Sequence, residues 1–307
     1  MNFDVVCMGE TLIDFIGNQE EKPIRETKDF HRYLGGSPTN VAMNLARLGL
    51  AVKMVSTVGN DGFGTFITSK LAQNNINIDD VKLDPQHATS VIFVSRTQNT
   101  PEFVAMRDAD FRLTTDQLSD DILAKSRLFH TTCFALSKQP ARDTILDRAK
   151  AAHALGAVIS IDINYAPEIW PDREQALESI EQYCRLNPVV KASEDDIIRL
   201  FGESMSHQEF FDTMHGWGAK QVCLTLGKAG AKLSDGDSIK ELAAIKIDKI
   251  MDATGAGDAF WSGFLFGYLK NHEPEKCMKA GLQMAAIKLQ HVGRIPDYAN
   301  IISSYFD

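Results

Sequence analysis

Residues suited to chemistry gather in one stretch late in the chain, residues 252–260. Apolar residues recur at helical spacing from the end of this stretch onward, which predicts a helix that starts near Gly257. The free amides of Gly255, Ala256 and Gly257 would point at the space in front of that helix and, with its dipole, form an anion site. Asp258 would lie in the first turn, beside the anion. Amides that hold a phosphate and a carboxylate that orients a hydroxyl are what phosphoryl transfer to an alcohol requires.

The same stretch also has simpler interpretations. Gly-Ala-Gly is typical of a tight turn between a strand and a helix, and an aspartate in a first turn complements the helix dipole. The glycine spacing does not match a dinucleotide fingerprint, because Phe260 occupies the position of the third glycine. No Gly-Lys-Ser or Gly-Lys-Thr follows, so the stretch is not a P-loop, and the signatures of protein kinases are absent.

Composition places the chain among globular proteins. Of its 307 residues, 44% are hydrophobic and 24% are charged, so one extended domain over residues 1–307 is expected. The net charge is −9 and no basic block is visible, so neither nucleic acid nor an anionic membrane is an expected partner. Five scattered cysteines, with no signal peptide or bilayer-spanning stretch, favour a cytoplasmic protein with reduced thiols. The eight histidines show no metal-ligand spacing.

Strand-like and helical segments alternate along most of the chain. This alternation predicts an α/β fold with a mostly parallel sheet covered by helices on both faces. Ser37 resembles a helix N-cap, with Pro38 at the first helical position. The expected strands are 4–8, 52–57, 128–133, 157–163, 189–192 and 221–226. The further expected helices are 63–73, 141–155, 173–184 and 208–217.

Two segments depart from this alternation, at approximately residues 15–35 and 88–113. The first is polar without a helical period, and the second contains two strands, 90–96 and 102–107, around a polar turn at 97–101. A small antiparallel sheet built from these segments would project from the main body. Such a sheet would be a lid over the site, a dimer surface, or both.

Several motifs, in this order and spacing, together resemble one family. They cover nearly the whole chain: residues 9–14, 35–42, 44–49, 58–64, 107–110, 162–165 with Trp170, 225–231 and 252–260. In these motifs the chain resembles the ribokinase-like (PfkB) carbohydrate kinases, and looks most like the fructokinases. The resemblance implies a three-layer α/β/α ribokinase-like fold with a small β-sheet lid, and a homodimer formed through that lid.

The resemblance also implies roles for the sugar-binding and catalytic residues. Asp258 would accept the proton of the attacking hydroxyl, and the amides of residues 255–257 would stabilise charge on the phosphoryl oxygens. The residues that would contact the sugar are Asp14, Gly35, Gly36, Asn40, Arg107 and Asn164. From the residues alone, without the resemblance, the favoured interpretation is that Asp14 is a turn residue and Asn40 an exposed helix residue.

The remaining implied sites concern ATP and its cations. Ser193, Thr225, Gly227 and Gly230 would lie at the nucleotide. Mg²⁺ would bridge ATP oxygens, with Asp196 acting through its water shell. Asp252 resembles a residue that binds a monovalent cation such as K⁺ in this family.

The opening Gly-Glu and Leu-Ile-Asp-Phe favour fructose, phosphorylated on a primary hydroxyl to fructose 6-phosphate. Kinases of 2-keto-3-deoxygluconate and of 5-dehydro-2-deoxygluconate share parts of these motifs and stay as alternatives. Ala166 replaces an arginine that is usual in the family and that would suit a sugar acid's carboxylate, although Arg107 remains. A non-catalytic sugar or nucleotide sensor on the same fold is an alternative of a different class. A nucleotide-cofactor oxidoreductase is disfavoured by the missing Gly-x-Gly-x-x-Gly after the first strand.

Overall fold

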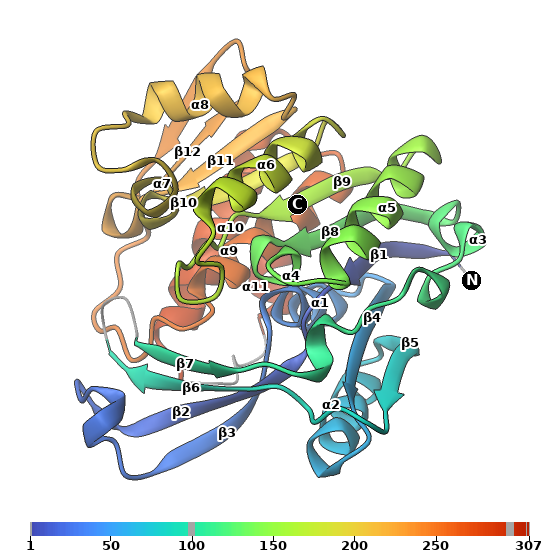
Figure 1. Ribbon diagram of the computed structural model, residues 1–307. Helices are drawn as coiled ribbons and strands as arrows, with labels where there is room; N and C mark the ends of the chain where they lie inside the picture. Colours follow the sequence, from blue (N-terminus) through green and yellow to red (C-terminus); the bar gives the residue numbers. More distant parts are fainter. Residues whose placement is uncertain (1, 98–101, 293–297, 305, 307) are drawn as a thin grey trace.

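The computed structural model of the chain describes residues 2–97, 102–292, 298–304 and 306 (Figure 1). Within these residues, nine strands form a main sheet in the order β13-β12-β11-β10-β9-β8-β1-β4-β5. The strands from β5 to β11 in this order run parallel, and β12 and β13 add an antiparallel edge. The strands are β1 (Phe3–Met8), β4 (Val52–Gly59), β5 (Asn77–Asp84), β8 (Ser126–Thr132), β9 (Val158–Asp162), β10 (Val189–Ser193), β11 (Gln221–Thr225), β12 (Ala231–Ser234) and β13 (Ile239–Leu242).

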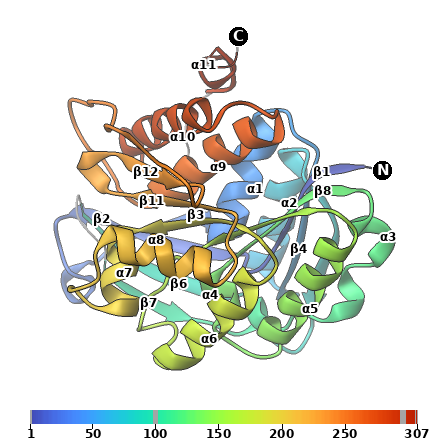
Figure 2. The ribbon, with the colours of Figure 1, turned by 90° about the horizontal axis from the view of Figure 1, so that it is seen from above.

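Helices cover both faces of this sheet, as the view from above shows (Figure 2). One face carries α1 (Ser37–Arg47), α2 (Gly62–Gln73), α9 (Ala256–Leu269) and α10 (Pro274–Leu289). The other face carries α5 (Ala141–Ala154), α6 (Arg173–Cys184) and α8 (His207–Gly216). The shorter helices are α3 (Asp120–Leu123), α4 (Cys133–Leu136), α7 (Glu194–Phe201) and α11 (Ala299–Ser303), with 3-10 turns η1 (Ile24–Glu26), η2 (Ala109–Phe111), η3 (Thr115–Gln117) and η4 (Gly227–Ala229).

Alternating side chains of each central strand feed two separate cores. In β1, Val5 and Cys7 pack with the core under α1, α2, α9 and α10, while Val6 and Met8 pack with the core under α5, α6 and α8. A parallel strand that is buried on both faces reads as a continuous apolar run, which is why β1 could be identified from the sequence. The expected three-layer arrangement with a mostly parallel sheet is confirmed.

A second sheet, the lid, projects below the main sheet in Figure 1. Its strands β2 (Leu12–Glu20), β3 (Phe30–Gly35), β6 (Val91–Arg96) and β7 (Phe103–Met106) pair in the order β3-β2-β6-β7. The lid is not fully antiparallel as expected, because β2 and β6 pair in parallel. Both strands follow a parallel strand of the main sheet and therefore leave it in the same direction. The polar turn expected at 97–101 falls mostly on residues 98–101, which lie outside the described residues.

Most expected elements are present, with shifted ends and some omissions. The helix expected from Gly257 begins at Ala256, after Gly255 in a left-handed conformation with φ 74°. Ser37 is not the N-cap of α1, since Gly36 takes that position at φ 100° and Ser37 is already helical. A side chain at Gly36 would also come within 2.4 Å of the Glu10 carbonyl oxygen, so the position requires glycine. No element was expected at β5, β12, β13, α7 or α10.

All five cysteines are described, and each is buried and free of any disulfide. Within the described part of the chain, no helix combines the length and the apolarity needed to cross a membrane.

Candidate active site

Asp258 is held in the first turn of α9 by two side chains of α1. The Ser37 hydroxyl donates to Asp258 Oδ1 at 2.6 Å, and the Asn40 amide donates to Asp258 Oδ2 at 2.8 Å. The residue is only 9% exposed, so burial raises the pKa of its carboxyl, and the two hydrogen bonds act in the opposite direction. Asn40 was expected near the site as a sugar ligand. Ser37 was expected only as a helix cap, and the sequence offered no signal for its contact with Asp258.

The three amides of the expected anion site differ in whether they already have a hydrogen-bond acceptor. The Ala256 amide donates to the carbonyl of Ala253 at 3.2 Å. The amides of Gly255 and Gly257 find no acceptor among the described residues. Two backbone donors at the start of a helix of fourteen residues are therefore left for an anion, next to the Asp258 carboxylate.

A cavity of about 540 Å³ lies in front of this helix start. Asn40 and Gly255, which flank the Asp258 carboxylate, line it together with Asp14 of the lid. Burial, followed by the charges of Asp258 and Asp252, raises the pKa of Asp14 to about 7. The cavity is large enough for a monosaccharide and more, and it presents carboxylates that can accept hydrogen bonds from sugar hydroxyls.

Gly35 ends β3 directly beside Asp14, and Gly36 follows it as the N-cap of α1. A side chain at Gly35 would meet the Asp14 carboxylate, with its Cβ 2.2 Å from Oδ2. The backbone of Gly35 therefore lies directly against Asp14, as a sugar-binding role for both residues needs.

Asp252 also lines the cavity, but its carboxylate already has a cationic partner. The Lys288 ammonium lies 3.2 Å from Asp252 Oδ2 and donates to the carbonyl of His291 at 3.1 Å. Both side chains of the ion pair are buried. An ammonium thus stands beside the carboxylate for which a monovalent cation was expected.

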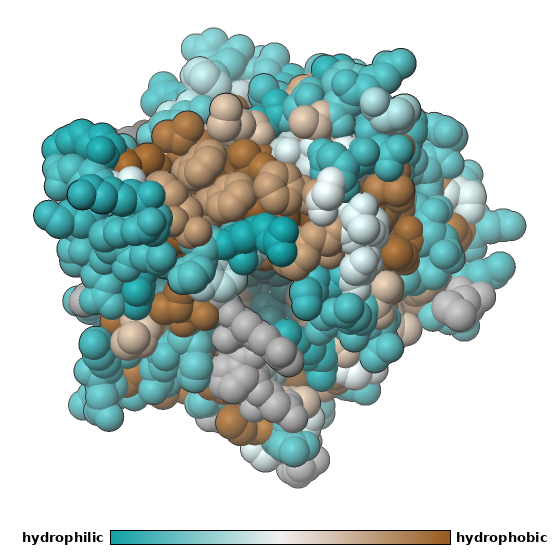
Figure 3. Space-filling view, turned by 90° about the horizontal axis from the view of Figure 1, so that it is seen from below, coloured by the Kyte–Doolittle hydropathy of each residue, from teal (hydrophilic) through white to brown (hydrophobic). Residues whose placement is uncertain are grey.

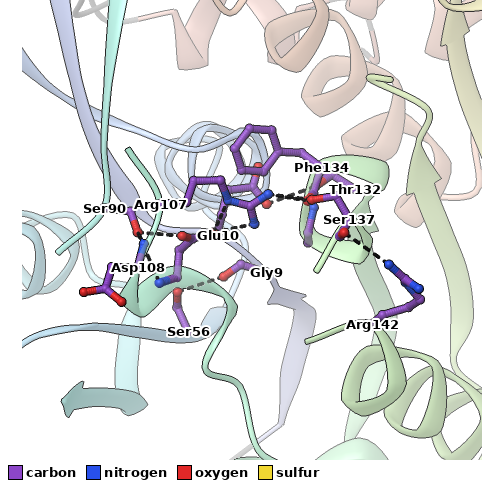
Figure 4. A network of polar contacts seen from close by, with 12 residues as sticks. Gly9, Glu10, Ser56, Ser90, Arg107, Asp108, Thr132, Phe134, Ser137 and Arg142 are labelled. Carbon is purple, nitrogen blue, oxygen red and sulfur yellow. Dashed lines mark hydrogen bonds and ion pairs between the residues drawn. The ribbon is translucent and has the colours of Figure 1, made fainter. Parts of the chain in front are cut away.

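Arg107 and Asn164 lie one layer behind the cavity. The Arg107 guanidinium pairs with Asp110 and donates to the carbonyl of Phe134 and to Ser137, and its side chain is 3% exposed (Figure 4). The Asn164 side chain accepts from the amide of Phe134 at 3.2 Å. In this structure both residues fasten the lid and β9 to α4, and neither lines the cavity.

Glu10 is a buried acid whose role the sequence did not indicate. Its carboxylate accepts from the amide of Ser37 and from the Thr132 hydroxyl, each at 3.0 Å (Figure 4). Burial raises the pKa of Glu10 to about 8, with the backbone hydrogen bonds and Arg107 opposing the shift. Glu10 thereby fixes the first residue of α1, the helix that holds Asp258.

The expected nucleotide residues meet at the carboxyl ends of neighbouring strands. Ser193 and Thr225 are register partners at the ends of β10 and β11. Gly227 and Gly230, at φ 53° and 110°, form the turn that leads into β12. Ligands of open α/β sheets bind in the crevice outside such strand ends, so the four residues lie together at the edge of the sheet where such ligands bind, and their contact with a nucleotide stays a prediction.

Asp196 serves a local structural purpose in the same crevice. Its Oδ2 accepts from the amide and hydroxyl of Ser193 in a capping box at the start of α7, and its Oδ1 accepts from the amide of Tyr165. Among the described residues, no three acidic, histidine or cysteine side chains form a metal-binding group.

The chain matches the model of the pfkB family carbohydrate kinases over residues 2–300. It is 33% identical to an ATP-dependent 6-phosphofructokinase from Thermoanaerobacterium thermosaccharolyticum, over 99% of this chain and 94% of that protein. Its structure resembles the fructokinase from Halothermothrix orenii, with a TM-score of 0.80 and 31% identity over 94% of this chain and 100% of that one.

A sugar kinase from Pyrococcus horikoshii, solved in complex with ATP, matches with a TM-score of 0.82 and 26% identity over 96% of this chain and 94% of that one. Ribokinase structures at lower identity have the same fold, which confirms the expected ribokinase-like architecture. With a family match across nearly its whole length, the chain belongs to the pfkB family of carbohydrate kinases.

Proposed function

We propose that this ATP-dependent sugar kinase phosphorylates a primary hydroxyl of a ketohexose, with fructose as the first candidate. One observation carries the proposal: Asp258, fixed by Ser37 and Asn40, stands beside the free amides of Gly255 and Gly257 at the edge of a sugar-sized cavity. The same arrangement supplies an acceptor for the hydroxyl proton and donors for the phosphoryl group.

In the proposed reaction the sugar lies between Asp14 and Asp258. Asp14 accepts hydrogen bonds from sugar hydroxyls and holds the reacting hydroxyl against Asp258. Asp258 orients this hydroxyl and takes its proton as the bond to phosphorus forms, while the amides of Gly255 and Gly257 donate to the phosphoryl oxygens. ADP, with the bridging oxygen of ATP, is the leaving group.

ATP would approach from the crevice formed by Ser193, Thr225, Gly227 and Gly230. Mg²⁺ would neutralise charge on the phosphate oxygens of ATP when bound. Mg²⁺ in kinases is held largely by phosphates and water. The residues present fit that mode, because the Asp196 carboxylate already accepts hydrogen bonds from two backbone amides and would hold the ion through water.

A phosphorylated ketose, such as fructose 6-phosphate, is the second candidate, and the far wall of the cavity favours it. Arg32, Arg47 and Lys70 line this wall around Phe66. The Arg32 guanidinium lies 3.9 Å and the Lys70 ammonium 5.9 Å from the centroid of the Phe66 ring. Within the described part of the chain, neither Arg32 nor Lys70 pairs with a carboxylate.

The distance along α1 agrees with a phosphate at that wall. Asn40, Met43, Asn44 and Arg47 lie on one side of α1 and all line the cavity. Seven residues of helix span about 10 Å at 1.5 Å per residue, so the wall lies roughly one hexose beyond Asp258. The 33% identical relative named as a 6-phosphofructokinase supports the same reading.

The sugar acids are supported less. Arg107, the arginine that the family motifs suggested for a carboxylate, pairs with Asp110 and donates to Phe134 and Ser137, and it does not line the cavity. Position 166 holds alanine, so it offers no second arginine.

An ADP-release assay with fructose, fructose 6-phosphate, 2-keto-3-deoxygluconate, 5-dehydro-2-deoxygluconate, ribose and adenosine tests these candidates. We expect turnover of fructose or fructose 6-phosphate above all others. Turnover of a sugar acid with neither ketose would overturn the ketose proposal. Sugar binding by calorimetry, without ADP release from any compound, would favour the sensor.

We further propose a homodimer formed through the lid. The underside of the molecule carries a patch of apolar residues over the lid (Figure 3). Val104 and Met106 of β7 are 48% and 61% exposed, and the partly buried Phe93 of β6 is paired with Val104 on the same face. An exposed apolar face on a sheet supports association with a second copy.

A further inference from the structure

Lys191 is a buried lysine on the apolar strand β10, directly behind the start of α9. It is 5% exposed, and its ammonium donates to Asp162 Oδ1 at 2.9 Å and to Asp162 Oδ2 at 3.1 Å. A Cβ atom added at Gly257 would lie 2.9 Å from Lys191 Nζ, nearer than real Cβ atoms approach. Glycine at position 257 thus makes room for an ammonium against the anion-binding turn.

The ammonium keeps a donor for this turn. Lysine has three N–H donors, and the Asp162 carboxylate is the one acceptor that Nζ contacts among the described residues. Burial disfavours the charged form, but the carboxylates of Asp162 and Asp196 outweigh it and raise the pKa of Lys191, which therefore stays protonated.

The surroundings of Asp258 are rich in other carboxylates. Asp14 faces it from the lid and Asp162 from β9, and each interacts with it electrostatically. The facing cations are Lys191 from β10 and Lys288 from α10. Lys288 is already paired with Asp252, and its Cε lies 3.7 Å from a Cβ atom placed at Gly255, whereas Lys191 Nζ lies 2.9 Å from one placed at Gly257.

The alternative is that Lys191 and Asp162 form an ion pair with a structural role alone. The chain contains such a pair elsewhere: Lys53 on β4 is 2% exposed and pairs with Asp80 at 2.8 Å, beside Asn77 and Phe3. Lys53 has no contact with the candidate site. Both lysines are buried and paired with an aspartate, and a buried ion pair contributes little net stability in either place. The difference between them is that Lys191 lies against Gly257 of the candidate site.

We propose that Lys191 is a positioning residue for phosphoryl transfer, whose ammonium, fixed by Asp162, places positive charge behind the turn that carries the phosphoryl-receiving amides and Asp258. The inference rests on the proposed function and deepens it. Burial raises the pKa of Asp258, the hydrogen bonds from Ser37 and Asn40 oppose this most, and the charge of Lys191 acts in the same direction as these hydrogen bonds, ahead of Lys288. Positive charge fixed in advance at this place stabilises the charge that develops in the transition state.

The test is the pH profile of kcat/KM for Lys191→Met, with the sugar that the wild type turns over. We expect the acidic limb to move to higher pH by about one unit, so that kcat/KM falls roughly fivefold at the old midpoint and roughly tenfold well below it, and kcat to fall further at every pH. Lys53→Met is the matched control, and we expect it to lose stability without moving the profile.

A second variant separates the electrostatic role from simple neutralisation of Asp162. Lys191→Met with Asp162→Asn leaves no unpaired charge, so we expect thermal stability to recover. The acidic limb should return only part of the way, because the loss of the Asp162 charge removes a repulsion from Asp258 without restoring the ammonium. Recovery of the wild-type profile in this double variant, or an unchanged profile in Lys191→Met, would overturn the inference while leaving the kinase intact. Wild-type protein that releases no ADP with any sugar would overturn the proposed function, and the inference with it.

Discussion

Replacing Gly35 with alanine tests the sugar-binding role of Asp14 without touching its carboxylate. The new Cβ atom would lie 2.2, 2.3 and 2.6 Å from the three carboxyl atoms of Asp14, where ordinary contacts begin near 3.4 Å. Gly35 has no positive φ, so its backbone accepts alanine, and the overlap must be relieved by the Asp14 side chain. Asp14 then turns away from the sugar.

The magnitude follows from the hydrogen bonds that the displaced carboxylate loses. A hydrogen bond to a charged group contributes about 1.5–3 kcal/mol, so losing one lowers kcat/KM by roughly 10- to 150-fold. Steady-state ADP release over a range of sugar concentrations measures this loss. Gly62→Ala is the control, because its added Cβ meets nothing within 4 Å, and its φ is also not positive. Wild-type kcat/KM in Gly35→Ala would refute the placement of the sugar beside Asp14.

Three further predictions concern protonation, cations and assembly. Burial raises the pKa of Asp14 to about 7, so its carboxylate forms only as the pH rises through that value. We therefore expect the KM for the sugar to fall as the pH rises over this range. Asp14→Asn, measured by the same kinetics, should show no such dependence on pH. Because the Lys288 ammonium already neutralises Asp252, ADP release should be equal in K⁺ and Na⁺ buffers, and a several-fold stimulation by K⁺ would contradict this. Met106→Glu should convert a dimer into a monomer in light scattering, whereas a dimer that persists would place the interface elsewhere.

The main sheet could be predicted because its central strands carry their signal locally. The apolar run of β1 is buried on both faces, and the alternation of strands with amphipathic helices follows from that layering. The edge strand β5 was missed because its sequence, Asn-Ile-Asp-Asp-Val-Lys-Leu-Asp, mixes charges with few apolar residues. The parallel pairing of β2 with β6 depends on the path of the chain between them, which no local pattern records.

The candidate site divides in the same way. Asp258 and the amides of Gly255 and Gly257 are neighbours in sequence, so their spacing was sufficient to predict that they lie together at the start of a helix. Ser37 contacts Asp258 across 221 residues of chain, and only the packing of α1 on α9 brings the two together. Arg107 was expected at the sugar, but in the folded chain its guanidinium donates to the Asp110 carboxylate and to the Phe134 carbonyl of α4. The buried ion pair of Lys191 could have been predicted from the sequence, because a lone lysine in an apolar strand needs a buried partner.

The measurement that tests the account most directly is turnover by Asp258→Asn, with ligand binding followed in parallel. Asparagine keeps the size of the side chain but cannot take the hydroxyl proton. We predict a kcat lower by about 10²- to 10⁴-fold, with ATP and sugar affinities by calorimetry close to those of the wild type. A variant that binds both ligands and retains a kcat near the wild-type value would contradict the assignment of Asp258 as the proton acceptor.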